Sequence, residues 1–186
     1  MIILSAPGGG LESLQRGTYN ADSSSQFSAG DDWGVSAAVY GWRVPIAAVD
    51  MGKAVVVPAG VSSDAVTQLT HRYYPAFRLV SETEIEFAMC STADAYVAWQ
   101  VLELNGVNVQ RGHGAARPES WVVLDIVVSP VDIERTEIRL TQTHADSSAN
   151  SMLHAELVDS NTLRLRRRNG SRNEAVLYSW ELIEYV

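Results

Sequence analysis

Two stretches of this 186-residue chain repeat one another, and this repeat constrains the fold more than any other feature of the sequence. Four short motifs recur in the same order in both halves, at offsets of 95, 82, 78 and 81 residues. The pairs are LQRG from Leu14 with VQRG from Val109, VDMGKAVVV from Val49 with VDIERTEIR from Val131, LVSETEIEF from Leu79 with LVDSNTLRL from Leu157, and YVAWQVLEL from Tyr96 with LYSWELIEY from Leu177. The spacing changes only between motifs, where loops tolerate insertions, so the pattern predicts a duplicated domain.

The repeated motifs are typical of strands. Ile85, Phe87 and Met89 alternate with less apolar neighbours, which is the period of a half-buried strand. Residues 121–128 are a short β-branched run bounded by Ser129-Pro130, which predicts a core strand. We therefore expect an all-β chain of two tandem, duplicated β-sandwich-like domains.

The offsets predict the domain limits. Residues 1–10 form an N-terminal arm, 11–104 the first repeat and 107–186 the second. The first repeat carries a loop insertion near 20–32, rich in Ser, Gly and Asp, which we expect to be exposed. One short helix near 63–71 is possible from the sequence.

Asn105-Gly106 joins the two repeats. This dipeptide favours a two-residue hairpin, because both residues tolerate positive φ. An ordinary turn at a domain boundary explains it equally well. Both alternatives stay open at this stage.

The composition disfavours several classes of function. The net charge of −8 repels nucleic-acid phosphates, so no nucleic-acid partner is expected. No apolar run approaches the length of a membrane helix, so no membrane partner is expected. The single cysteine, Cys90, excludes an internal disulfide and is expected to be a buried structural thiol.

No motif predicts catalysis, a cofactor or a metal. His71, His113, His144 and His154 form no paired metal-ligand motif, and His113 and His144 fall in loop-like stretches. Asp31-Asp32 matches no calcium-loop spacing, and Pro7–Gly10 lacks the lysine of a phosphate loop. We expect no enzyme.

Charge separates the two repeats on one matched strand. The first repeat carries Glu82, Glu84 and Glu86, whereas the second carries Arg164, Arg166 and Arg168. One hypothesis is that these faces meet, within the chain or between subunits. The alternative is a solvated edge strand whose charges deter aggregation.

The tryptophans divide into two kinds. Trp99 and Trp180 occupy equivalent positions and are expected in the two cores. Trp33 and Trp42 lie in or near the insertion and have no counterpart in the second repeat. Exposed aromatic residues of this kind serve carbohydrate- or protein-binding surfaces, although packing of Trp42 in the core is the stronger expectation.

The repeated motifs resemble those of structural proteins of tailed bacteriophages. The matching residues are Gln15–Gly17 with Gln110–Gly112, Val49-Asp50 with Val131-Asp132, Leu79 with Leu157, and Trp99–Glu103 with Trp180–Glu184. The resemblance implies a non-catalytic virion component, made in the host cytoplasm: a tail- or baseplate-associated protein or a capsid decoration protein. Its implied partners are other virion proteins of the capsid, tail or baseplate, and copies of itself in a homo-oligomer. The alternative is a host-surface or carbohydrate-binding module that uses the first-repeat loop.

Overall fold

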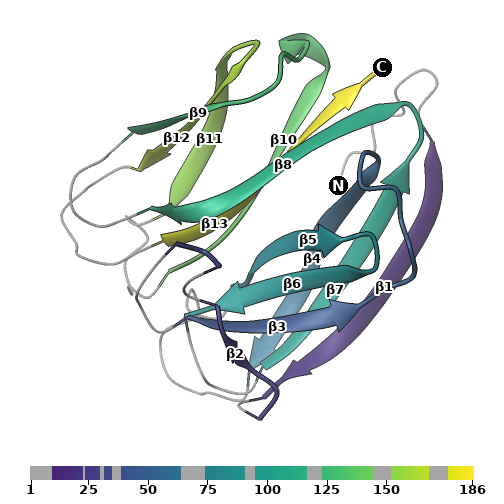
Figure 1. The fold of residues 1–186 in the computed structure, drawn as a ribbon, viewed down its shortest axis with the longest axis vertical. Coiled ribbons are helices and arrows are strands. Elements are labelled where there is room, and N and C mark those ends of the chain that lie inside the picture. Colours follow the sequence, from purple (N-terminus) through teal and green to yellow (C-terminus); the bar gives the residue numbers. More distant parts are fainter. Residues whose placement is uncertain are drawn as a thin grey trace.

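The protein is an all-β chain of two β-sandwich-like units, which confirms the predicted fold class (Figure 1). The computed structural model describes residues 10–22, 24–29, 32–34, 39–63, 74–90, 95–116, 123–144, 152–167 and 176–186. In these ranges the only helix is a single 3₁₀ turn, Ile133–Arg135. The predicted arm at 1–9 and the possible helix after Ser63 lie outside the described residues.

The first unit consists of two antiparallel sheets. One has the strand order β1-β7-β4 and the other β2-β3-β6-β5. Their bounds are β1 Leu11–Ala21, β2 Phe27–Ser28, β3 Tyr40–Pro45, β4 Ala54–Ser63, β5 Ala76–Ser81, β6 Glu84–Met89 and β7 Ala95–Leu104.

The second unit repeats this topology. Its sheets have the orders β10-β13-β8 and β11-β12-β9, so each strand has a counterpart in the first unit, and only β2 is extra. The bounds are β8 Val107–Ala116, β9 Val123–Val127, β10 Thr136–His144, β11 Leu153–Asp159, β12 Thr162–Arg167 and β13 Val176–Tyr185. The matched strand orders support the duplication inferred from the motifs.

Each unit has its own apolar core between its sheets, with one of the paired indoles in it. Trp99 packs with Val97, Phe87 and Ile85 in the first unit. Trp180 belongs to the equivalent cluster of the second unit. Both tryptophans are 7% exposed, so the prediction that they are core residues is confirmed.

The glycine of each QRG motif makes room for the indole. Gly17 of β1 lies opposite Trp99 of β7, and Gly112 of β8 lies opposite Trp180 of β13. A Cβ on Gly17 would lie 2.7 Å from Cζ2 of Trp99, and one on Gly112 would lie 2.6 Å from Cζ2 of Trp180. No side chain fits at that distance, so glycine and tryptophan form one steric unit in each repeat.

The glutamine of each QRG motif forms hydrogen bonds with the backbone of a connecting loop. Gln15 donates from Nε2 to the Ala47 carbonyl at 2.9 Å, and its Oε1 accepts from the Ala47 amide at 2.7 Å. Gln110 makes the same pair of bonds with Ser129, at 3.0 and 2.8 Å. A side-chain amide can satisfy both backbone groups of one residue in this way, because it carries a donor and an acceptor.

The other motifs meet at the same end of each sandwich. The Asp50 amide donates to Oε1 of Glu103 at 2.7 Å, and the Asp132 amide donates to Oε1 of Glu184 at 2.8 Å. The repeated residues are thus those that close one end of each sandwich by hydrogen bonds.

Asn105-Gly106 forms a tight turn but not a hairpin. Gly106 has a φ of +69°, as such a turn requires. The flanking strands β7 and β8 belong to different sheets and have no pairing between them. The dipeptide is therefore a turn at the boundary between the units, the second of the two alternatives.

The expected core strand at 121–128 is only half-buried. The described strand β9 covers Val123–Val127; Leu124 and Ile126 pack against the second core. Val123 is 41% and Val127 84% exposed, because no described segment covers the outer face of this sheet. Side chains alternate between the two faces of the strand, and this alternation, not the apolar character of the whole run, determines which of them are buried.

Replacing Gly17 or Gly112 with alanine tests the steric unit. We expect each variant to lower the free energy of unfolding by about 1–3 kcal/mol, because the new Cβ displaces a packed indole. Urea denaturation measures the change, with Gly10→Ala as control, since a Cβ there meets nothing within 4 Å. Variants as stable as the control would show that the indoles do not occupy these positions.

Candidate functional site at the junction of the two units

The second unit covers the open edges of both sheets of the first unit. Strands β4 and β5 are the edges in question, since each has a sheet neighbour on one side only. An edge strand presents unpaired amide and carbonyl groups, which favour pairing with another chain. Figure 1 shows β8 and β13 beside the first unit, and β10 also reaches it through Thr141.

Side chains of the second unit bind the backbone of β4. Glu181 of β13 accepts a hydrogen bond from the Val56 amide, at 3.2 Å to its Oε2. Arg111 of β8 donates from Nη2 to the Ala54 carbonyl at 2.6 Å. The amide of Val109 adds a bond of 2.9 Å to the carbonyl of Gly52. A carboxylate supplies the acceptor and a guanidinium the donor that a further strand would otherwise supply.

Thr141 of β10 binds the backbone of β5 in the same manner. Its Oγ1 accepts from the Phe77 amide at 2.9 Å and lies 3.2 Å from the Phe77 carbonyl, to which it can donate. A hydroxyl performs both roles because it is at once donor and acceptor.

Apolar contacts complete the junction. Val55 of β4 packs with Val107 of β8 and Ile183 of β13. Leu177 of β13 joins a cluster with Trp33, Ala76 and Ala88 of the first unit. Consequently β13 is buried on both faces along most of its length.

Glu181 is the buried charge of this junction. Its side chain is 8% exposed, and the nearest cation is Arg111, with 3.7 Å between Arg111 Nε and Glu181 Oε1. Burial raises the pKa of Glu181 to about 7, although Arg111, the Val56 amide and Arg139 act in the opposite direction. Burial also lowers the pKa of Arg111, against the attraction of Glu181.

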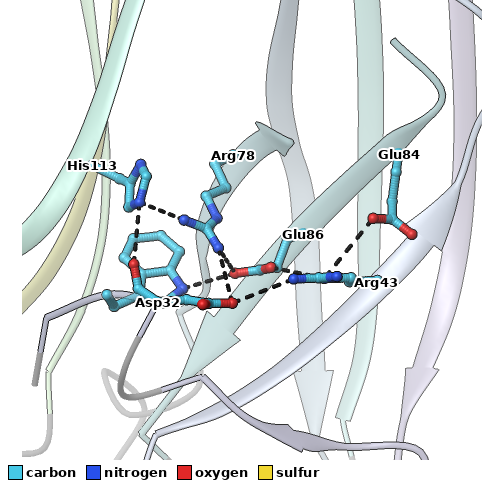
Figure 2. Close-up of polar contacts among 7 residues, drawn as sticks. Asp32, Arg43, Arg78, Glu84, Glu86 and His113 are labelled. Atoms are coloured by element: carbon cyan, nitrogen blue, oxygen red, sulfur yellow. Dashed lines mark hydrogen bonds and ion pairs between the residues drawn. The ribbon is translucent and has the colours of Figure 1, made fainter. Parts of the chain in front are cut away.

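A second polar cluster surrounds Glu86 of β6 (Figure 2). The Glu86 side chain is fully buried and accepts from three donors. These are Trp33 Nε1 at 2.8 Å, Arg78 Nη2 at 2.7 Å and Arg43 Nε at 3.1 Å. Three charge-assisted or indole hydrogen bonds compensate for the lost hydration of the carboxylate.

The Glu86 cluster extends across the junction to His113 of β8. Nη1 of Arg78 lies within hydrogen-bond distance of His113 Nε2, and a guanidinium can only donate in this contact. The same Nε2 lies 3.3 Å from the Asp32 carbonyl. The Trp33 ring lies edge-on to His113, with 5.3 Å between ring centroids, and the Arg78 guanidinium stands 4.9 Å from the Trp33 ring. Burial, followed by the charge of Arg78, lowers the pKa of His113 below 6.5.

A groove of about 500 Å³ separates the two polar clusters. It is lined from both units by Asp32, Arg43, Met51, Arg78, Leu79, Val80, Arg111, Gly112, His113 and Ser179. Its cations are already paired: Arg43 and Arg78 with Glu86 and Asp32, and Arg111 with Glu181. The groove is thus a partly apolar cleft between the two units.

Four of the six charged residues predicted as an interface form ion pairs within their own units. Besides the fully buried Glu86, Glu84 lies 3.9 Å from Arg43, while Glu82 uses its carbonyl to bind the Val49 amide. Arg164 makes a two-pronged ion pair with Asp125, at 2.6 and 2.7 Å, and Arg166 pairs with Glu156 at 2.5 Å. Arg168 lies outside the described residues. In the described part of the chain these two charged faces do not meet, and contact between subunits stays a prediction.

The aromatic residues predicted for surface binding are buried. Trp33 is 1% exposed and Trp42 is fully buried, where it stacks on Phe87 in the first core. The insertion is therefore not merely an exposed loop: Ala29 is fully buried, and Phe27 begins the added strand β2. Its apolar residues pack with Ala76 and Ala88 on the outer face of β5 and β6, together with Leu177 of β13.

Other predicted residues lie as follows. His113 is in a strand and not in a loop, and Cys90 is half-buried just after β6. Asp32 forms ion pairs with Arg43 and Arg78, at 3.3 and 3.7 Å, and Asp31 and His71 lie outside the described residues. In the described ranges no group of three or more His, Cys, Asp or Glu side chains is arranged to hold a metal ion.

Sequence reasoning missed Glu181, Arg111 and Thr141 as junction residues. One signal was present: β13 has Leu177 and Ile183 on the face opposite Trp180, so the strand is apolar on both sides. A strand of this kind is covered on both faces.

Comparisons with known proteins found no match among protein-family models, curated proteins or solved structures. No described segment forms a helix of the length and apolar character needed to cross a membrane.

Glu181→Gln tests the buried carboxyl. The folded-state pKa of about 7 exceeds the reference value of 4.5, so the folded protein holds a proton that the unfolded chain loses in this window. Relative to the Gln variant, the wild-type free energy of unfolding should fall as pH rises from about 4.5 to 7, by at most about 3 kcal/mol.

Urea denaturation across this pH range measures the difference, and subtraction of the variant cancels the opposite effect of His113. Glu134→Gln, at an exposed position, is the control and should leave the pH dependence unchanged. Parallel curves for wild type and Glu181→Gln would mean that Glu181 is in water.

Trp33→Phe tests the buried hydrogen bond that the insertion makes to Glu86. Phenylalanine keeps most of the apolar contact but removes the indole donor to buried Glu86, so we expect a loss of about 1–3 kcal/mol in unfolding free energy. Tyr74→Phe, at a position that is 56% exposed, should cost far less. Equal stabilities of the two variants would contradict the buried hydrogen bond.

Proposed function

We propose that this chain is a non-catalytic structural component of a bacteriophage virion, which assembles through the faces of its β-units. In this proposal it is a tail- or baseplate-associated protein or a capsid decoration protein, made in the host cytoplasm and incorporated into the particle. Its partners are other virion proteins of the capsid, tail or baseplate, and copies of itself.

The observation that carries the proposal is the junction between the units. Glu181 and Thr141 bind edge backbone groups of the first unit, and apolar side chains pack beside them. A junction that buries β13 on both faces holds the two units at one angle. Fixed geometry suits a part whose work is to dock on a regular array.

The repeated motifs resemble those of tailed-bacteriophage structural proteins, and this resemblance is the reason that we propose a virion role. The motif residues line the closed end of each sandwich, where Gln15 and Gln110 fasten equivalent loops. They support the scaffold itself, which is what a structural repeat requires.

The alternative of a carbohydrate-binding module depended on exposed indoles of the first-repeat loop. Trp33 is instead packed between Glu86 and His113, and Trp42 is in the core. The structure therefore favours the structural role over this alternative.

Proteomics of purified particles tests the proposal. We expect the chain in phage particles from the source genome at a fixed ratio to the major capsid protein, and retained after a density gradient. A glycan array with the purified chain is the parallel arm. Absence from particles, together with binding of a glycan, would overturn the proposal in favour of the alternative.

A further inference from the structure

Both sides of the junction have counterparts at the opposite ends of the chain. Within the chain, side chains of β8, β13 and β10 cover the edge formed by β4 and β5. The duplication supplies an equivalent face on β1 and β7 of the first unit and an equivalent edge on β10 and β11 of the second. In Figure 1, β1 runs along the border of the molecule away from the second unit.

Part of the face of β1 and β7 is exposed, although Leu102 of β7 packs against the cluster of Val55, Val107 and Ile183. Arg16 lies opposite Gln100, as Arg111 lies opposite Glu181. Tyr96, at the position of the fully buried Leu177, is 54% exposed.

Leu14 extends this apolar surface. It stands at the position of Val109 and is 41% exposed. Two large apolar side chains and an arginine on one sheet face form a surface suited to a partner.

The edge of β10 and β11 leaves the second core partly open. In the first unit, the core residues along the covered edge are almost fully buried: Val56 and Phe77 are 3% exposed and Leu79 is 4% exposed. Their counterparts Ile138, Ala155 and Leu157 are only half-buried. Among the described residues nothing covers this edge as the second unit covers the first.

We infer that this exposed face of one copy binds the open edge of a second copy, so that the chain assembles head to tail. The inference rests on the proposed structural role and names the chain itself as the partner. By the equivalence of positions, Arg16 would donate to the Thr136 carbonyl of the neighbour, and Gln100 would accept from its Ile138 amide. Each contact repeats one made within the chain by Arg111 or Glu181.

The contact between copies is more polar than the contact within the chain. Glu137 and Arg139 occupy the positions of Val55 and Val57, and Glu12 occupies that of Val107. Association is therefore weaker than the internal junction, because Glu137 would face Glu12 where Val55 packs with Val107 within the chain. Because the two surfaces differ, the contact is heterologous and builds a ring or a filament.

Sedimentation velocity of the full chain tests the inference. The wild type is expected to associate reversibly with rising concentration, and Arg16→Glu should weaken association by about tenfold or more. Val127→Glu, at a position that is 84% exposed on β9, is the matched control and should leave association unchanged. A wild type that stays monomeric at all concentrations, or an Arg16→Glu variant that associates like the control, would overturn the inference.

A pair of cysteines tests the contact itself. Within the chain the Val109 amide binds the Gly52 carbonyl, and the equivalent positions on the two free surfaces are Leu14 and Glu134. Leu14→Cys with Glu134→Cys should form a ladder of disulfide-linked multimers under mild oxidation. Thr18→Cys with Glu134→Cys is the control, because position 18 lies about 13 Å further along β1.

The two experiments separate this inference from the proposed function. Cysteine-linked multimers from a chain that is absent from particles would support head-to-tail assembly and overturn only the virion role. A chain present in particles that forms no more linked multimers than the Thr18 control, in solution or in the particle, would overturn only the head-to-tail contact.

Discussion

The rest of the structure depends on the need to cover two open sheet edges in the first unit. Strands β4 and β5 each lack a neighbour on one side, and their free backbone groups would attract other chains. Glu181, Arg111 and Thr141 bind these groups from the second unit. Burial of Glu181 is the cost of this arrangement, since it raises the pKa of that carboxyl to about 7. The two similar units thereby become one body.

The insertion of the first unit serves the same junction. Trp33 covers the outer face of β6 and β5, binds the buried Glu86 and touches His113 of the second unit. Among its described residues the second unit has no such cover on the matching sheet, where Arg164 and Asp125 form a surface ion pair instead. The two repeats thus differ in sequence on this pair of matching sheets, which is covered in the first unit and carries a surface ion pair in the second.

The sequence predicted the repeated scaffold but not the junction. Gly17 with Trp99, and Gly112 with Trp180, recur because one fold requires the same close packing twice. Glu181, by contrast, replaces Gln100 at the equivalent position, and only the docked neighbour shows why a carboxylate is there. The prediction that Trp33 is an exposed binding residue was wrong for the same reason, since the composition of a loop does not show which surface the loop packs against. The opposed charges of Glu86 and Arg164 suggested a mutual contact, but each has a nearer partner in its own unit.

The amide of Val56 provides the most direct test of this account, because a side chain of the other unit is its acceptor. Hydrogen exchange followed by NMR would measure its protection beside that of the central strand β7. The account predicts that the Val56 and Phe77 amides exchange as slowly as those of β7, through opening of the whole junction. Exchange at the fast rate of an uncovered edge strand, with β7 still protected, would contradict it.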